Sequence, residues 1–257
     1  MLNKNDNKPL FSIITVCFNS EKTIEQTIQS ILKQTFKDFE YIIIDGGSKD
    51  STLEIINKYR DHIKTVVSEK DDGIYDAMNK GIVLAEGSII GLLNSDDWYE
   101  PETLQIVAEE YLQSDGETLF HGLCKLIENG KEGSIISYHH DVLPYYCICH
   151  TSCFLPKKLY VKYGLFDTSY KIAGDYELLL RLYISGVRFK RLEKILVNFR
   201  SGGVSDSLKS TYEDIKIQYH HKLFGKNKYY MKLMKHAVVH VSKVLIVRSY
   251  QKLILGR

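Results

Sequence analysis

The chain has 257 residues, of which 44% are hydrophobic and 26% are charged, and its formal net charge is +2 at pH 7. This is the composition of an ordinary globular protein, and the length suits one large α/β domain with an appendage. No apolar run reaches 18 residues, which excludes a helix that spans a bilayer. The first nine residues are polar and lack the apolar core of a signal peptide, so we expect that the protein is not exported.

Strands and helices alternate through the first 112 residues. Four short, mostly apolar runs predict buried strands, at residues 11–18, 40–44, 64–68 and 88–93. Segments with apolar residues on one face predict helices, at residues 21–33, 53–59, 73–85 and 101–112. This alternation predicts a parallel sheet flanked by helices. Ligands bind such sheets beyond the carboxyl ends of the strands.

Polar groups, most of them acidic, follow each of these four strands. They are Asn19, Asp45, the pair Asp71 and Asp72, and the segment Asn94-Ser95-Asp96-Asp97. Parallel strands bring these groups into one crevice. Carboxylates gathered there repel each other unless a cation, or a ligand rich in hydroxyl and N–H donors, lies among them. The pattern therefore suggests a nucleotide and a divalent metal ion.

The second half of the chain is less regular. The Asn129-Gly130 dipeptide predicts a hairpin between strands at residues 118–127 and 133–138. Further elements are predicted as helices at residues 157–163 and 176–185, a strand at 189–199, and helix from about residue 210 onward. Ten of the 34 Lys and Arg residues lie after residue 214, but none of the 32 Asp and Glu residues does. A basic tail thus follows an acidic body.

The order of the motifs resembles that of the family 2 glycosyltransferases, and most closely that of bacterial enzymes that build surface polysaccharides. The matching segments are SIITVCFN at residues 12–19, IDGGSKDST at 44–52, GIYDAMNKG at 73–81, LNSDD at 93–97 and GDYELLLR at 174–181. The resemblance covers about residues 10–205. It implies the α/β GT-A fold, which is a Rossmann-like, mostly parallel sheet flanked by helices, here with a C-terminal helical appendage.

The resemblance also implies a division of the chain. Residues 1–209 would form the GT-A domain, with a nucleotide-binding half at about 10–115 and an acceptor half at 116–209. Residues 210–257, which the resemblance does not cover, are predicted from their alternation of basic and apolar residues to form a basic, amphipathic helical tail. The apolar run at residues 237–247 within this tail is interrupted by His240 and Lys243 and is too short to span a membrane.

Several residues take roles in donor binding through the resemblance. Those assigned to the nucleotide are Thr15, Cys17, Phe18, Asn19, Asp45, Asp72 and Asp96. A carboxylate suits uracil N3–H and ribose hydroxyls because these groups are donors. For Asp45 the alternative is a turn-forming role. Asp71 could serve in place of Asp72, and a solvated turn is the alternative for both.

Asp96 and Asp97 match the family's metal-binding acidic motif. A hard cation such as Mg²⁺ or Mn²⁺ takes oxygen ligands and would bridge these carboxylates to the diphosphate. It would also stabilise the nucleoside diphosphate as it leaves. The family often has an acid where this chain has Asn94. Either of the two remaining carboxylates can therefore be the direct ligand.

Asp175 matches the base on the acceptor side of the family's site. In an inverting transfer this carboxylate removes the proton from the attacking hydroxyl. A first-turn helix acid is the alternative, and both roles can coexist. Asn94, His150 and Gly174 are assigned to the acceptor or donor-sugar pocket, although a lone His is as often structural. The family often has Glu at the position of Gly174. Residues 201–205 resemble a loop that closes over the site, or are simply a turn.

Five irregularly spaced cysteines argue against a disulfide framework and for a reducing compartment. Cys147, Cys149, His150 and Cys153 cluster in one stretch, whereas zinc sites usually offer two separated pairs. We therefore expect buried or half-buried thiols in preference to a metal site.

The resemblance to the family 2 glycosyltransferases implies an inverting, metal-dependent glycosyltransferase that uses a nucleotide-sugar donor, most simply a UDP-sugar. The acceptor would be a hydroxyl of a lipid-linked molecule or an oligosaccharide. The basic tail is expected to lie on the cytoplasmic face of the membrane. Packing of the tail on the acidic body and a dimer contact are its alternatives. No nucleic-acid module accompanies the tail, so nucleic acid is not expected as a partner.

Two other functions compete with this prediction. A nucleotidyltransferase would need a basic, glycine-rich phosphate loop after the first strand, and residues 19–22 do not form one. A non-catalytic scaffold that binds nucleotide sugars is the second rival, because Asn94 and Gly174 depart from the family's pattern. Truncation after Ser210 is expected to release the protein from membranes and to leave nucleotide binding intact.

Overall fold

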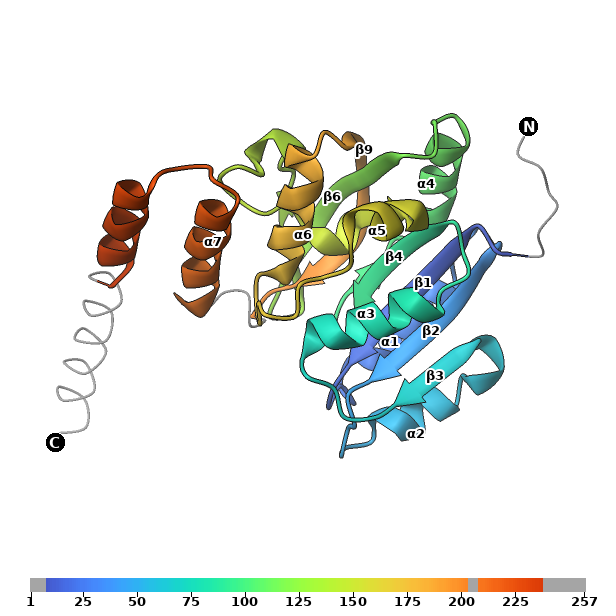
Figure 1. Cartoon of the computed structure of the whole chain (residues 1–257). Helices are drawn as coiled ribbons and strands as arrows, with labels where there is room; N and C mark the ends of the chain where they lie inside the picture. The colour runs from blue at the N-terminus through green and yellow to red at the C-terminus, as the bar shows by residue number, and fades with distance from the viewer. Residues whose placement is uncertain (1–7, 203–207, 238–257) are drawn as a thin grey trace, which may run out of the picture.

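The computed structural model describes residues 8–202 and 208–237, and the structural statements below refer to these residues. They form a mixed sheet of nine strands with helices on both faces (Figure 1). The strand order is β3-β2-β1-β4-β8-β6-β9-β5, and β7 pairs with β6. The predicted α/β class is confirmed.

The first half has the predicted alternation of strands and helices. The four strands β1 (Phe11–Cys17), β2 (Phe39–Asp45), β3 (Thr65–Ser68) and β4 (Ile89–Asn94) are parallel. The intervening and following helices are α1 (Ile24–Leu32), α2 (Thr52–Asn57), η1 (Arg60–His62), α3 (Ile74–Leu84) and α4 (Thr103–Leu112). Each α-helix packs an apolar stripe on the sheet, which is why the sequence periodicity located all four.

The second half extends the sheet with strands of both directions. Its strands are β5 (Trp98–Tyr99), β6 (Thr118–Glu128), β7 (Lys131–Ile136), β8 (Cys153–Pro156) and β9 (Arg188–Arg200). The β6–β7 hairpin has the predicted turn, because Asn129 and Gly130 both adopt positive φ. β8 is antiparallel to both β4 and β6 and so joins the two halves. The sequence did not predict β5 and β8, which are only two and four residues long.

The remaining helical elements surround the second half. They are η2 (His140–Val142), η3 (His150–Ser152), α5 (Lys157–Tyr163), α6 (Gly174–Ile184) and α7 (Leu208–His220), and residues 226–237 are also helical. Helix is therefore found in most of the expected stretch up to residue 237, but as two helices, because residues 221–225 between them are not helical. Most of the apolar run at residues 237–247 lies outside the described residues. No helix in the described part of the chain is long and apolar enough to cross a membrane.

The sheet separates two hydrophobic cores, because neighbouring residues of a strand point to opposite faces. In β1, Ile14 and Val16 face the core shared with α3, α5 and α6. Phe11, Ile13 and Cys17 face the core shared with α1, α2 and α4. α7 lies beside α6 (Figure 1) and contributes the fully buried Ile217 to the first of these cores. The C-terminal region thus packs on the body at least through α7.

The cysteines differ from the expectation of free thiols throughout. Cys124 of β6 and Cys149, just before η3, form a disulfide, whereas Cys17, Cys147 and Cys153 are free. The expectation is wrong for the bonded pair, because the pairing of β6 with β8 brings together cysteines 25 residues apart. Spacing alone does not reveal this contact.

Candidate active site

The register of the parallel strands aligns the predicted polar groups at one edge of the sheet. Cys17 at the end of β1 lies opposite Asp45 of β2, and Asp45 lies opposite Ser68 of β3. Val16 lies opposite Asn94 at the end of β4. The loops beyond these ends are hydrogen-bonded to one another, for example through Ser20 Oγ and Ser95 Oγ at 2.8 Å. The strand ends and the loops beyond them therefore form one connected edge of the sheet.

Asp45 is at the predicted place but is fully buried, and its carboxylate is already bonded. The Ser48 and Ser68 hydroxyls donate to it, the latter at 2.6 Å, as do the N–H groups of Gly47 and Ser48. These bonds close the turn that follows β2, in the manner of an Asx turn. The geometry supports a role in shaping the loop, and direct contact of Asp45 with a nucleoside stays a prediction.

The four predicted residues at the end of β1 are placed differently from one another. Thr15 is fully buried and accepts a hydrogen bond from Tyr41 at 3.0 Å. Cys17 is buried, and burial, followed by the charge of Asp45, raises the pKa of its thiol. Asn19 has a φ of 49°, and its Oδ1 accepts from the Lys49 N–H at 2.8 Å. Phe18, at 62% exposed, and Asn19 are the two of the four that are open to a ligand.

Asp71, which follows β3, points back over the end of β2. A Cβ atom added at Gly46 would lie 2.4 Å from Asp71 Oδ2, so the glycine makes room for this carboxylate. The other oxygen of Asp71 accepts from the Gly73 N–H at 3.0 Å. Asp72 is exposed, and its own N–H donates to Asp76 at 3.2 Å. Of the two acids that the sequence offered, Asp71 is the one placed over the strand ends.

The acidic turn between β4 and β5 contains the predicted metal ligands. Asp97 is 1% exposed, and burial, followed by the charge of Asp96, raises its pKa to about 8. Asp96 is more open, and burial raises the pKa of its carboxyl too. Asp97 Oδ2 and Asn94 Oδ1 are buried without a hydrogen-bond partner. Unpaired oxygen atoms beside two mutually repelling carboxylates fit a divalent cation, which takes oxygen ligands and would relieve the repulsion.

Arg200 at the end of β9 holds this turn, and the sequence interpretation missed it. Its backbone N–H donates to Asp97 Oδ1 at 2.9 Å and its Nε donates to the Asp96 carbonyl at 3.1 Å. The guanidinium lies over the Trp98 ring, 5.1 Å from the centroid. The antiparallel pairing of β5 with β9 produces these contacts across more than a hundred residues. Beyond Arg200, residues 203–205 of the predicted closing loop lie outside the described residues.

Asp175 lies in the first turn of α6 and is paired with His150 of η3. His150 Nδ1 is 3.2 Å from Asp175 Oδ2, and the Tyr75 hydroxyl of α3 donates to Asp175 Oδ1 at 2.9 Å. Burial acts to raise the pKa of Asp175, but the hydrogen bond and charge of His150, with the Tyr75 bond, lower it overall. The pair raises the pKa of His150 in spite of its burial. At neutral pH the Asp175 carboxylate is therefore ionised, as a base must be.

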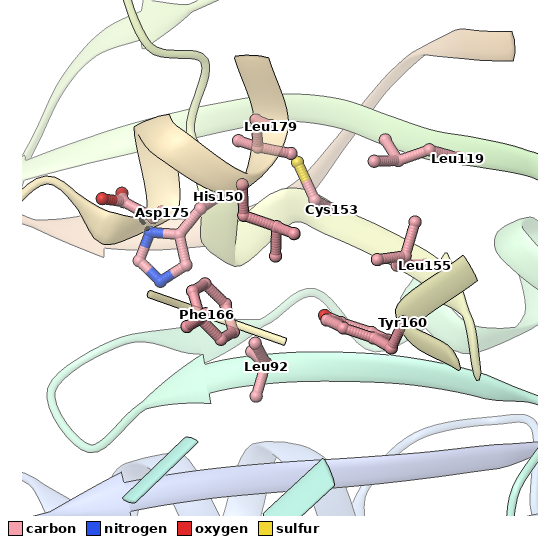
Figure 2. A pocket seen from close by; sticks show the side chains of 10 residues that line it. Leu92, Leu119, His150, Cys153, Leu155, Tyr160, Phe166, Asp175 and Leu179 are labelled. Carbon is pink, nitrogen blue, oxygen red and sulfur yellow. Dashed lines mark ion pairs between the residues drawn. The ribbon is translucent and has the colours of Figure 1, made fainter. Parts of the chain in front are cut away.

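His150 also connects this pair with the acidic turn. The charges of Asp97 and Asp96 contribute to the raised pKa of His150. His150 Nε2 is buried and has no hydrogen-bond partner, so it can donate to a bound ligand. A small cavity behind the pair is otherwise lined by apolar side chains, among them Leu92, Phe166 and Leu179 (Figure 2). His150 and Asp175 are thus the charged residues of a cavity whose other side chains are mostly apolar, and these apolar side chains are called the apolar floor below.

Gly174 is in contact with the ring of Tyr75. A Cβ atom added at Gly174 would lie 2.8 Å from two ring carbons of Tyr75. The Tyr75 hydroxyl bonds Asp175, so the space left by the missing side chain is used to bring this tyrosine to Asp175. This contact gives a physical reason for glycine at a position where the family often has Glu.

Comparison with known proteins agrees with this geometry. Glycosyl transferase family 2 matches residues 12–129. A PGL/p-HBAD biosynthesis glycosyltransferase of Mycobacterium bovis is 30% identical over 207 residues, which are 78% of this chain and 80% of that protein. Chondroitin synthase of Escherichia coli is 31% identical over 228 residues, 85% of this chain but only 32% of the synthase. This chain thus spans about a third of the synthase's length.

A solved structure shows the same fold. S. aureus TarS 1–349, in complex with UDP-GlcNAc, superposes with a TM-score of 0.68 at 22% identity, over 90% of this chain and 72% of that one. The sheet and its flanking helices are thus those of a GT-A enzyme, which confirms the predicted fold. Together with the sequence matches, this places the chain among the glycosyltransferases. It belongs to glycosyl transferase family 2.

Proposed function

We propose that this protein is an inverting glycosyltransferase that takes a sugar from a nucleotide donor and that Asp175 is its base. The observation that supports this most directly is the His150–Asp175 pair at 3.2 Å, set between an apolar floor and the acidic turn. Asp175 would accept the proton of the acceptor hydroxyl while the oxygen of that hydroxyl bonds to the anomeric carbon of the donor sugar. The bond from that carbon to the diphosphate breaks on the opposite face, and the nucleoside diphosphate leaves.

The donor is proposed to be a UDP-sugar. TarS, which has the same fold, is known in complex with UDP-GlcNAc. In this chain Phe18 offers an open aromatic face at the end of β1, and Asp71 offers a carboxylate over the end of β2. An aromatic face suits stacking on a base, and a carboxylate accepts from the donors of uracil and ribose. Asp45 and Asn19 would shape the same pocket from below.

A divalent metal ion is proposed at the acidic turn. Asp96, the more open carboxylate, and the unpaired oxygen atoms of Asp97 and Asn94 would hold it. When bound, Mg²⁺ or Mn²⁺ would neutralise the diphosphate of the donor and stabilise it as a leaving group. Arg200 fixes the turn through its backbone N–H, which donates to the Asp97 carboxylate, and through its Nε, which donates to the Asp96 carbonyl, and so keeps these oxygen atoms in place.

The acceptor is proposed to be a lipid-linked or oligosaccharide hydroxyl in the synthesis of a bacterial surface polysaccharide. The relatives support this, since they are named for chondroitin synthesis and for PGL/p-HBAD biosynthesis. The proposed location is the cytoplasmic face of the membrane, reached through the basic C-terminal tail. Exposed Lys226, Lys228 and Lys235 lie on the described part of this tail together with exposed Tyr230 and Met231.

A donor screen tests the proposal. Purified protein with Mn²⁺ or Mg²⁺ is incubated with a panel of nucleotide sugars and saccharide or lipid-linked acceptors, and release of nucleoside diphosphate is measured. We expect release from one donor, its loss with EDTA, and a loss of at least a hundredfold in Asp175→Asn with donor affinity unchanged. Donor binding without turnover in the wild type would instead support the scaffold that binds nucleotide sugars.

A further inference from the structure

We propose that Glu213 of α7 is a positioning residue for Asp175, because its carboxylate fixes the backbone from which α6 begins. The inference rests on the proposed function in that Asp175 is taken as the base. It assigns α7, which follows the matched motifs in sequence, to the machinery of the acceptor side.

The contact is a carboxylate held by three successive backbone N–H groups. Lys171 N–H donates to Oε1 at 2.9 Å and lies 3.2 Å from Oε2. The N–H groups of Ile172 and Ala173 donate to Oε2 at 2.9 Å and 2.8 Å. Glu213 is separated from these residues by 40 to 42 positions in the chain, so this is a tertiary contact.

The segment that leads into α6 has no side-chain cap of its own. The first N–H groups of a helix have no acceptor within the helix and are usually satisfied by a side chain at the N-cap. The N-cap of α6 is Ala173, whose side chain makes no capping hydrogen bond. The N–H groups that Glu213 accepts from are those of Ala173 and of the two residues before it, so Glu213 fixes, from another helix, the segment that leads into α6. Its negative charge also suits the positive end of the helix dipole.

The same short segment is bonded to the groups that hold the base. The Tyr75 hydroxyl lies 2.6 Å from the Ile172 carbonyl and 2.9 Å from Asp175 Oδ1, and its single proton is shared between these two acceptors. Glu213 therefore holds the N–H of Ile172 while Tyr75 holds its carbonyl. If the segment moves, Tyr75 and Asp175 lose their mutual position, and small displacements of a catalytic group can cost about a hundredfold in rate.

α7 is itself fixed against α6, so Glu213 is presented from a rigid support. Gln218 Nε2 donates to the Tyr176 hydroxyl at 3.0 Å and to the Tyr145 carbonyl at 3.1 Å. His221 Nε2 is 3.0 Å from Glu177 Oε1. Tyr176 and Glu177 directly follow Asp175, so contacts from the α7 region bracket the base on both sides in the sequence.

Two measurements on the full chain test the proposal, with Glu213→Ala, Glu213→Gln and the control Thr211→Ala, an exposed residue of the same helix. The first is amide hydrogen exchange over residues 171–173, which needs no substrate. We expect faster exchange in Glu213→Ala, partial protection in Glu213→Gln, which keeps one acceptor oxygen, and wild-type exchange in Thr211→Ala. Unchanged exchange in Glu213→Ala would overturn the proposal.

The second measurement is steady-state transfer. We expect kcat to fall about 10- to 100-fold in Glu213→Ala with the donor KM unchanged, and Glu213→Gln to recover part of the loss. Faster exchange with an unaltered kcat would overturn the proposal. So would a donor KM that rises by as much as kcat falls. A wild-type protein that turns over no donor would contradict the proposed function, and the Glu213 contact would still be decided by exchange.

Discussion

Gly174 shows how the absence of a side chain can shape an active site. The Tyr75 ring occupies the space that a side chain at this position would need, and its hydroxyl bonds the Asp175 carboxylate. The departure from the family's Glu therefore comes with a replacement contact from α3. The loss of that Glu therefore gives no support to the non-catalytic scaffold, because Asp175, the proposed base, is held by the Tyr75 hydroxyl.

Gly174→Ala is expected to displace Tyr75 and to weaken its bond to Asp175. We expect kcat to fall about 10-fold or more. The donor affinity should be unchanged, because the residues proposed to bind the donor follow β1 to β3, whereas Asp175 lies on α6. Steady-state kinetics with varied donor and acceptor would measure this. Gly225→Ala is the matched control, because an added Cβ there meets nothing within 4 Å. Wild-type kcat in Gly174→Ala would contradict the role given to this contact.

Residue-level prediction from the sequence succeeded where a motif and a strand end coincide. The acids at positions 45, 71, 96 and 97 and their common edge could be predicted from the alternation of strands and helices. Tyr75 and Arg200 could not, because their contacts with Asp175 and Asp97 span 100 and 103 residues and follow from tertiary packing. The burial of Asp45 could not be predicted from the sequence either, because it depends on hydrogen bonds from the Ser48 and Ser68 hydroxyls to the carboxylate.

At the scale of elements, α7 was predicted as a helix but not as part of the core. Most residues of α7 are polar and the residues that follow it are basic, and this pattern favoured a tail separate from the body. The structure places Ile215 and Ile217, 7% and 0% exposed, against the body. A cut after Ser210 would therefore remove core side chains as well as Glu213, so nucleotide binding in such a fragment is a poor test of the tail. The domain boundary at residue 210 stays a prediction.

Ile217→Ala tests this packing. Removing a fully buried isoleucine leaves a cavity, and we expect the free energy of unfolding to fall by about 2–5 kcal/mol. Urea denaturation followed by circular dichroism would measure the change. Met234→Ala, at a residue 61% exposed on the outer helix, should change stability by less than about 0.5 kcal/mol. Equal effects of the two substitutions would show that α7 does not belong to the cooperative unit.

For the whole molecule, the separation of charge is the dominant feature. The helix at residues 226–237 touches α7 through Lys232, whose Nζ donates to Gln218 Oε1 at 2.6 Å. Lys226, Lys228 and Lys235 remain exposed beside Tyr230 and Met234. Basic and apolar side chains together suit the interface of an anionic membrane. A tail that starts near residue 225 is thus compatible with a body that retains α7.

Charge reversal tests the membrane role without truncation. In the triple variant Lys226→Glu, Lys228→Glu and Lys235→Glu, we expect binding to vesicles that contain anionic lipid to fall about a hundredfold or more, at about 1 kcal/mol per basic residue. Reversal of three exposed lysines of the body, Lys33, Lys58 and Lys131, is the control for net charge. Cosedimentation at varied salt would measure both. Equal losses in the two variants would contradict a specific role of the tail.

The link between Glu213 and residues 171–173 has a consequence for the order in which the protein matures during translation. The strand ends proposed to bind the donor and the acidic turn are complete once the ribosome has released β9, but the backbone before Asp175 waits for α7. We expect a newly made chain to reach its full rate of sugar transfer only when α7, which ends at His220, has emerged. Turnover by stalled nascent chains of graded length would show a step at that length.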